Sequence, residues 1–435
     1  MNMVNQTSMD DKRVTQYAQS RQEPKWLLEK RLDALSQIEE LALPQLEKTN
    51  INNWNFTKFD AFKEEEAITA LQELPSEFSA FVFDQETANV VVQKNASSVF
   101  QQFDPQIADK GVIFSDLHTA LREHEELVKS YMMSSKMKRD EHKLAAIHQA
   151  LFNGGVFLYV PKNVELTIPF QSLFYGQGKD AAILPYIMIV TEENARVEFI
   201  ANFVADKSDE VAMHNGMIDV FVGSNANVRV STMNNLNQTA VDVLYRRSYV
   251  GRDGQLEWIT SELSDGRTIS DNTTHLVEDG GTVNVKAVIL GAGETRSNIT
   301  TNIRHWGKHT NSDIHARSVM KDAATNILNS ITKIEKDASK SDGQQTGKVL
   351  MLNPKARGDA NPILLIDEND VTAGHAASVG RVDPLQMYYL MSRGVSKEQA
   401  EKLIIYGFLD AVISDIPSEA LQKRIHEVIE GKFQS

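Results

Sequence analysis

A repeat of about thirty residues fills the middle of the chain and constrains its fold more than any other feature. In each copy a turn-forming Asn, Asp or Gly is followed three positions later by an aliphatic residue. The aliphatic positions lie 31, 31, 28, 27 and 31 residues apart; they are Leu166, Val197, Val228, Leu256, Val283 and Ile314. A near-constant period of roughly 20–50 residues is typical of stacked repeat architectures.

The residue types within each copy indicate what one repeat forms. Short runs of Val, Ile, Phe and Tyr alternate with Asn, Gly and Asp, which tolerate the positive φ angles of tight corners. One turn of chain cannot bury its apolar face alone, so successive turns stack and share a core. We therefore expect residues 151–383 to form a right-handed parallel β-helix. An antiparallel sandwich also has many short strands, but the near-constant period disfavours it.

Residues 1–150 have a mostly helical pattern. Pro24 is suited to the start of a helix, and leucines recur after it at helical spacing. Short apolar runs at residues 81–83 and 90–92 predict a strand pair joined by a turn. The first part of the chain is therefore expected to be an N-terminal helical domain with one short strand pair.

Residues 384–435 return to a helical pattern. Asp383 before Pro384 is typical of a helix start, and Ser396 with Gln399 forms a capping-box pattern. The sequence thus predicts a C-terminal helical domain. We expect its helices to cover the open end of the β-helix, because unpaired strand edges tend to associate.

Composition excludes several functional classes. The 435 residues carry a net charge of −14, whereas nucleic-acid and anionic-membrane partners require a basic surface. Cysteine is absent, so the chain has no thiolate nucleophile and no sulfur ligand for a metal cluster. Neither a signal peptide nor an apolar run of membrane-spanning length is recognised, and we expect a cytoplasmic protein.

Four segments resemble the SufB/SufD family of iron–sulfur cluster assembly proteins. The most specific is C-terminal: residues 361–383 read NPILLIDENDVTAGHAASVGRVD and continue into a similar helical stretch. Residues 155–166 resemble the entry into the family's β-helix, residues 305–314 a late turn of it, and residues 23–32 its N-terminal helix. These segments are spread along the chain, so the resemblance covers most of its length.

The resemblance implies a scaffold subunit rather than an enzyme. SufB-type members carry a cysteine that receives sulfur; its absence here makes the chain most like the SufD type. The family pattern then implies pairing with a SufB-like subunit through the β-helix ends and docking of SufC-like ATPase subunits on the C-terminal helices. A homodimer is a further possibility for the isolated chain. No stably bound cofactor is implied, only a transient iron–sulfur cluster shared with the SufB-like partner.

His375 is the candidate ligand for that cluster. In the family pattern a histidine at this place lies near the partner interface, and imidazole is a suitable ligand for iron. Ala373 and Gly374 precede it, so no thiolate accompanies it on this side. The alternative is a buried histidine hydrogen-bonded to the backbone.

The C-terminal helices carry the other candidate site. Its residues form an apolar stripe expected either to pack in the core or to dock the ATPase: Leu403, Ile404, Phe408 and Val412. A metal site at His305, His309 and His315 is disfavoured, because the spacing of the first two has meaning only on a helix. Residues 343–349 lack the spacing of a phosphate-binding loop. A polysaccharide-acting β-helix enzyme is the alternative function.

Overall fold

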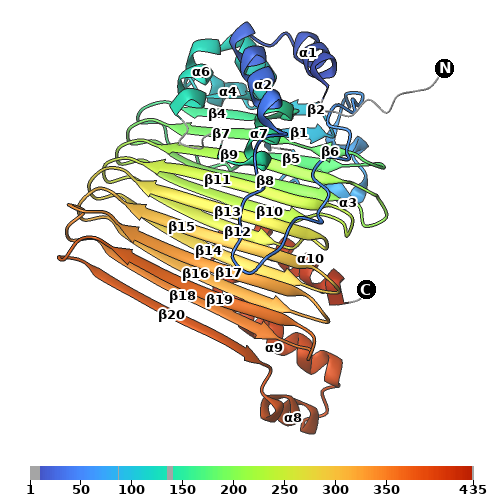
Figure 1. Ribbon diagram of the computed structural model, residues 1–435, viewed down its shortest axis with the longest axis vertical. Helices are drawn as coiled ribbons and strands as arrows, with labels where there is room; N and C mark the ends of the chain where they lie inside the picture. Colours follow the sequence, from blue (N-terminus) through green and yellow to red (C-terminus); the bar gives the residue numbers. More distant parts are fainter. Residues whose placement is uncertain (1–9, 87, 135–140, 434–435) are drawn as a thin grey trace.

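Two long sheets face each other and enclose the core of the chain (Figure 1). The computed structural model describes residues 10–86, 88–134 and 141–433. Successive strands of the repeat region alternate between the two sheets, and neighbours within each sheet are parallel. The predicted parallel β-solenoid is therefore confirmed.

The two sheets are built as follows. The first contains, in spatial order, β2 (Ser97–Gln102), β1 (Asn89–Lys94), β5 (Phe170–Gly176), β8 (Arg196–Ala205), β10 (Asn227–Asn235), β12 (Gln255–Glu262), β14 (Thr282–Gly291), β16 (Asn311–Met320), β18 (Asp342–Met351) and β20 (Thr372–Arg381). The second contains β19 (Arg357–Ile366), β17 (Thr325–Ile334), β15 (Arg296–His305), β13 (Arg267–Leu276), β11 (Val241–Val250), β9 (Met213–Val222), β7 (Pro185–Thr191), β4 (Gly154–Val160) and β3 (Ile113–Asp116), while β6 (Ala182–Ile183) pairs with β9.

The corners of the solenoid explain the turn residues of the repeat. Asn163, Asn194 and Asn225 have φ angles of 61°, 58° and 54°, and their side chains form a hydrogen-bonded ladder from turn to turn. The aliphatic positions of successive repeats pair in register from β8 to β14. From β8 to β14, each turn of the solenoid thus repeats a corner residue with positive φ and, three positions later, an aliphatic strand residue.

The sequence pattern places the sixth repeat two residues too late. Val283 pairs with Ser312 in β16, not with Ile314, and the corner with positive φ is His309 rather than Asn311. A small polar residue occupies the aliphatic position here, so the sequence pattern shifted to the next aliphatic residue.

The N-terminal domain closes one end of the solenoid. Its helices are α1 (Asp11–Ser20), α2 (Lys25–Gln37), α3 (Ser76–Ser79), α4 (Pro105–Ala108), α5 (Leu117–Glu123), α6 (Glu125–Ser134) and α7 (Lys143–Leu151), with a 3-10 turn at Leu71–Glu73. The strand pair predicted at residues 81–83 and 90–92 is wrong in its first member. Residues 81–83 are irregular backbone whose apolar side chains pack in the core, and β1 pairs antiparallel with β2 instead.

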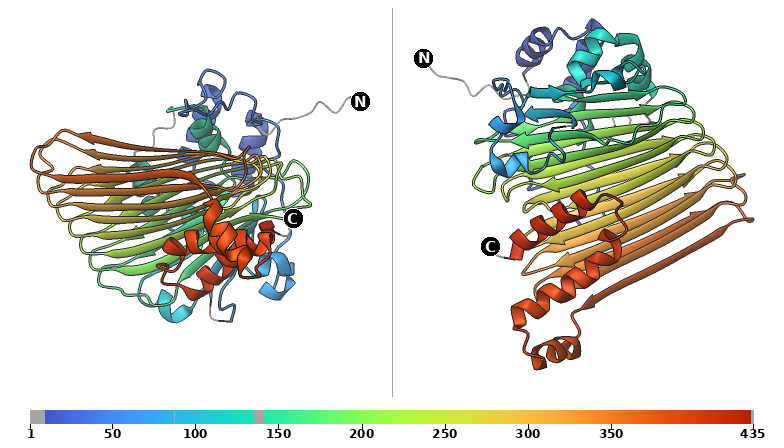
Figure 2. Two further views of the ribbon diagram at one scale, coloured as in Figure 1. Left: turned by 90° about the horizontal axis from the view of Figure 1, so that it is seen from below. Right: turned by 180° about the vertical axis from the view of Figure 1, so that it is seen from behind.

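The C-terminal helices are α8 (Pro384–Ser392), α9 (Lys397–Ile413) and α10 (Glu419–Phe433). The caps predicted at Asp383 and Ser396 are both present. The expectation that these helices cover the open end is wrong. α9 packs on the outer face of β14 and β16, and α8 projects beyond the last turn (Figure 2). The apolar outer side chains of the first sheet supply the packing surface, and the free edges of β19 and β20 lie beyond these helices. Lys48 of the N-terminal domain contacts Asp359 and Asn361 of β19.

Among the described helices, none combines the length and the hydropathy needed to cross a membrane.

Candidate functional site

The open end of the solenoid is the first candidate site. β19 and β20 are the terminal strands of their sheets, each ten residues long, and each is hydrogen-bonded to a neighbour on one side only. Apart from Gly358, which is buried, their residues are exposed or half-buried. Four large apolar side chains of this end are between 38% and 47% exposed: Ile363, Leu365, Ile366 and Val379. Long, apolar and unpaired strand edges are templates for association with another chain.

His375 lies in the middle of this edge. It belongs to β20 and is exposed, so a buried histidine held by the backbone does not describe this position. In the register of β18 and β20 it pairs with Gln345, and paired side chains in a parallel ladder lie on the same face. Gln345 is 2% exposed and bonds to Thr332 and to the carbonyl of Ile363 in the facing sheet. The imidazole therefore stands over the interior of the last turn.

Around His375 the described residues form no complete ligand set for a metal ion. Among the described residues, no group of three His, Cys, Asp or Glu side chains could hold a metal ion. The sequence contains no cysteine at all.

The remaining histidine and glycine motifs of the sequence belong to strands and corners of the solenoid. His305 points into the solenoid, where Thr310 and Ser312 hydrogen-bond its two ring nitrogens and burial lowers its pKa to about 4. His309 forms a corner, and His315 lies on the outer face beside Asp313. The glycines near Lys348 belong to β18, a regular strand and not a phosphate-binding loop.

The C-terminal helices present the second candidate site. The predicted stripe is divided by the packing of α9. Leu403 is 54% exposed, whereas Val412 is 1% exposed and packs in the core cluster against the first sheet. Phe408 is half-buried against the same cluster and lies under the Arg317 guanidinium. Ile404 is half-buried and borders a hollow of about 430 Å³.

That hollow lies between α8 and α9. Its lining consists of Asp383, Leu385, Gln386, Tyr389, Leu390 and Ile404. Leu385, Tyr388 and Tyr389 are 75%, 72% and 56% exposed, respectively. Sequence analysis missed these three residues, although a helix with apolar side chains around its whole circumference was the available signal. Exposed aromatic and leucine side chains beside a hollow are typical of a protein docking surface.

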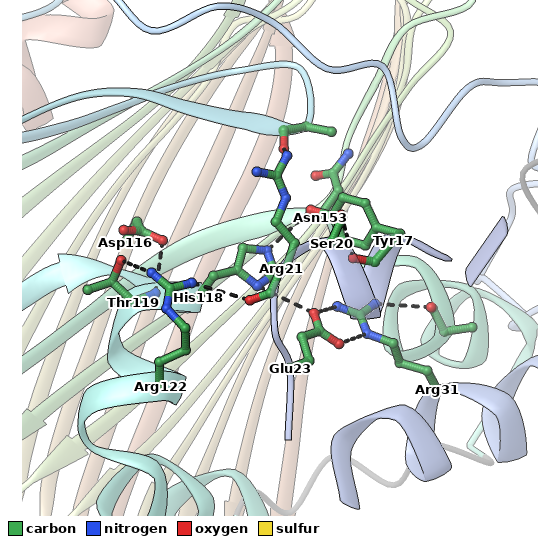
Figure 3. Close-up of polar contacts among 12 residues, drawn as sticks. Tyr17, Ser20, Arg21, Glu23, Arg31, Asp116, His118, Thr119, Arg122 and Asn153 are labelled. Atoms are coloured by element: carbon green, nitrogen blue, oxygen red, sulfur yellow. Dashed lines mark hydrogen bonds and ion pairs between the residues drawn. The ribbon is translucent and has the colours of Figure 1, made fainter. Parts of the chain in front are cut away.

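A buried ion pair explains the family-like motif at residues 23–32 (Figure 3). Arg31 donates two hydrogen bonds to the carboxylate of Glu23, at 2.7 and 2.8 Å, and both side chains are 0% exposed. Its Nη1 donates to the Ala150 carbonyl oxygen at 3.1 Å, and its guanidinium lies 3.7 Å from the centre of the Phe152 ring. The pair therefore fastens α2 to α7.

His118 joins this cluster from α5. Its Nδ1 lies 3.3 Å from Glu23 Oε1, and its Nε2 lies 3.2 Å from the hydroxyl of Tyr17 (Figure 3). Burial lowers the pKa of His118 to about 4, against the raising effect of Glu23. Burial opposes ionisation of Glu23, but the guanidinium of Arg31 outweighs it and the pKa of the carboxyl is lowered. Tyr17, Glu23, Arg31 and His118 thus contact one another, and the cluster has a structural role in holding the helices of the N-terminal domain together.

The solenoid interior holds further buried polar and ionisable side chains that the sequence did not reveal. Arg246 donates to Glu262, at 3.0 Å, and His214 contacts Asp242 at 2.7 Å, all of them at most 4% exposed. Their neighbours in the chain are ordinary strand residues, so no local signal marked them. Removing one partner of a buried ion pair such as Arg246 and Glu262 is costly, because the other charge stays buried without a partner.

Comparison with known proteins identifies the family. The profile of the SufBD core domain, described as SUF system FeS cluster assembly, matches residues 174–408. The profile of the SufBD protein N-terminal region matches residues 13–172. Together the two matches extend from α1 to α9.

Individual relatives agree with these profiles. The iron–sulfur cluster assembly protein SufD of Bacillus subtilis is 44% identical over 437 aligned positions, covering 100% of both chains. SufBD family proteins of Staphylococcus haemolyticus and Staphylococcus epidermidis are 26% identical, covering 93% of this chain and 89% of theirs. The chain therefore belongs to the SufB/SufD family of SUF-system iron–sulfur cluster assembly proteins and is most like SufD.

Proposed function

We propose that this chain is a scaffold subunit of a SUF-type complex, without turnover of its own. Its open solenoid end pairs with a SufB-like subunit, and its C-terminal helices dock a SufC-like ATPase. The observation that carries the proposal is the uncovered last turn, an apolar strand edge with His375 at its centre. Family membership favours this function over the polysaccharide-acting alternative.

Strand geometry supports the pairing. Ten residues of an extended strand measure about 33 Å, and both sheets end in such an edge. A partner with its own solenoid edge would continue both sheets and satisfy their free backbone groups. The same edge is where two copies would pair in a homodimer of the isolated chain.

His375 then provides an imidazole ligand to a cluster under construction at that junction. The cluster is the complex's cargo, not a cofactor of this chain, because the chain brings no thiolate. Sulfur and the other ligands come from the SufB-like side. The exposure of the imidazole leaves it accessible to a partner.

ATPase docking uses the surface formed by Leu403, Ile404 and the exposed side chains of α8. Helix-in-groove packing is the expected mode, with apolar side chains as anchors. Because α9 also packs on β14 and β16, a movement of α9 caused by the bound ATPase would be transmitted directly to the first sheet.

Co-expression tests the complex. This chain should co-elute with SufB- and SufC-like subunits in size-exclusion chromatography. A Val379→Lys variant, altered only at an exposed edge position, should lose the SufB-like subunit and retain the ATPase. Elution of the wild-type chain alone would contradict the proposal.

A second experiment tests the ligand role of His375. The His375→Ala complex should assemble normally and keep its ATPase activity, but should hold less iron and sulfide after anaerobic reconstitution. His315→Ala, at an exposed histidine away from the edge, is the matched control. Unchanged iron in the His375→Ala complex would refute the ligand role.

A further inference from the structure

Gln345, the residue paired with His375 in the adjacent strand, has an unpaired amide oxygen in the described part of the chain. Gln345 occupies the paired position on the adjacent strand, and neighbouring strands of a sheet are about 4.8 Å apart. The Gln345 side chain is 2% exposed, while His375 above it is exposed. Amide and imidazole therefore follow one another at the end of the same interior column.

The hydrogen bonds of Gln345 show which of its two amide atoms has no partner among the described residues. Its Nε2 donates to Thr332 Oγ1 at 2.6 Å and to the Ile363 carbonyl oxygen at 3.2 Å. These two acceptors fix the orientation of the amide. Its Oε1 is buried and has no hydrogen-bond partner in the described part of the chain. A buried acceptor without a donor is unfavourable, so a nearby N–H is a favourable partner for it.

We propose that Gln345 is a positioning residue for His375. Its Oε1 accepts the ring N–H of His375, which fixes the tautomer and turns the other nitrogen, with its lone pair, toward the open end. Metal-binding histidines commonly donate their second ring nitrogen to such an oxygen, and loss of the acceptor typically reduces metal affinity by roughly 10–100-fold. The inference rests on the ligand role proposed above for His375.

The tautomer of His375 can be measured on the isolated full-length chain, without any metal. Nitrogen-15 labelling of the 11 histidines and long-range proton–nitrogen correlation spectra distinguish the two neutral tautomers. The spectrum of His375→Ala identifies the signal. One tautomer should dominate in the wild type, and Gln345→Leu, which removes the acceptor, should give a mixture of both.

Gln344 provides the matched control. It is the preceding residue of β18, lies on the opposite face, and donates to Asp342. Gln344→Leu should leave the His375 tautomer unchanged. An equal change in both leucine variants, or none in Gln345→Leu, would overturn the proposal. Gln345→Met also removes the acceptor oxygen, at nearly the length of glutamine, and serves if Gln345→Leu does not fold; it should likewise give a mixture of tautomers, and a wild-type tautomer there would overturn the proposal.

Iron retention by the reconstituted complex separates this inference from the ligand role. Gln345→Leu should hold iron less tightly than wild type, by roughly 10–100-fold in affinity. If His375→Ala leaves iron unchanged while Gln345→Leu alters the tautomer, the ligand role fails and the positioning contact stands. If His375→Ala loses iron but Gln345→Leu has a wild-type tautomer, the ligand role stands and the positioning contact fails.

Discussion

Replacement of Arg31 by Met should weaken the N-terminal domain severely. The substitution removes both hydrogen bonds to Glu23, the bond to the Ala150 carbonyl and the contact with Phe152. Methionine fills a similar apolar volume, so the main loss is electrostatic. Glu23 is left as a carboxylate that is 0% exposed, beside His118 and without its guanidinium partner.

The expected magnitude follows from that burial. Breaking a fully buried ion pair by removing one partner costs about 3–5 kcal/mol, because the remaining charge stays desolvated. This cost corresponds to an increase of roughly two to four orders of magnitude in the opening equilibrium of the domain. An exposed pair would lose about 1 kcal/mol or less. The exposed Lys25–Glu29 pair on the same helix is the matched control, and Lys25→Met should change little.

Hydrogen exchange measured by mass spectrometry reports this opening locally. Peptides from α1, α2 and α7 should exchange faster in Arg31→Met, while peptides from β11 to β17 should not change. The double variant Glu23→Leu with Arg31→Met should recover most of the loss, since an apolar replacement of both partners leaves no unpaired charge. A loss below about 1 kcal/mol in Arg31→Met, or a double variant that is worse than the sum of the single ones, would refute the reasoning.

The remaining predictions concern acid stability, the α9 surface and the corners. Burial lowers four histidine pKa values from 6.5 to about 4; they belong to His118, His142, His148 and His305. Between pH 6.5 and pH 4 these histidines are protonated in the unfolded chain but not in the folded chain. The free energy of unfolding should therefore fall as the pH is lowered over this range, as measured by urea titration. An unfolding free energy that stays constant over the range would contradict the prediction. Leu403→Asp should weaken ATPase binding at least about tenfold in calorimetry with little change in stability, whereas Leu409→Ala, at a 0% exposed position, should cost about 2–5 kcal/mol in urea denaturation. Asn194→Val should cost about 1–2 kcal/mol because its φ is 58°, and Asn194→Gly should cost less.

The solenoid was predictable because its turns repeat the same physical requirement. Corners with positive φ select Asn, Asp or Gly, and the interior selects an aliphatic residue at a fixed distance from each corner. The prediction failed at β16, where His309 forms the corner and Ser312 takes the interior position. Other residues can satisfy both requirements locally, and sequence patterns then lose the register.

The neighbourhood of His375 was only partly predictable. The resemblance drew attention to the histidine, but its exposure depends on where α8 and α9 pack, which a helical pattern does not determine. Gln345 lies thirty positions earlier and is brought beneath His375 only by the register of β18 and β20. Val412 and Leu403 belong to the same apolar stripe, yet tertiary packing buries one and exposes the other.

Hydrogen exchange of the last solenoid turn tests the central claim most directly. Backbone amides of β19 and β20 should exchange rapidly in the monomeric chain, and the edge amides should become protected when the SufB-like subunit is added. Amides of β17 and β18, which are already paired on both sides, should change little. Protection that arises elsewhere, with β19 and β20 unchanged in a stable complex, would contradict the account.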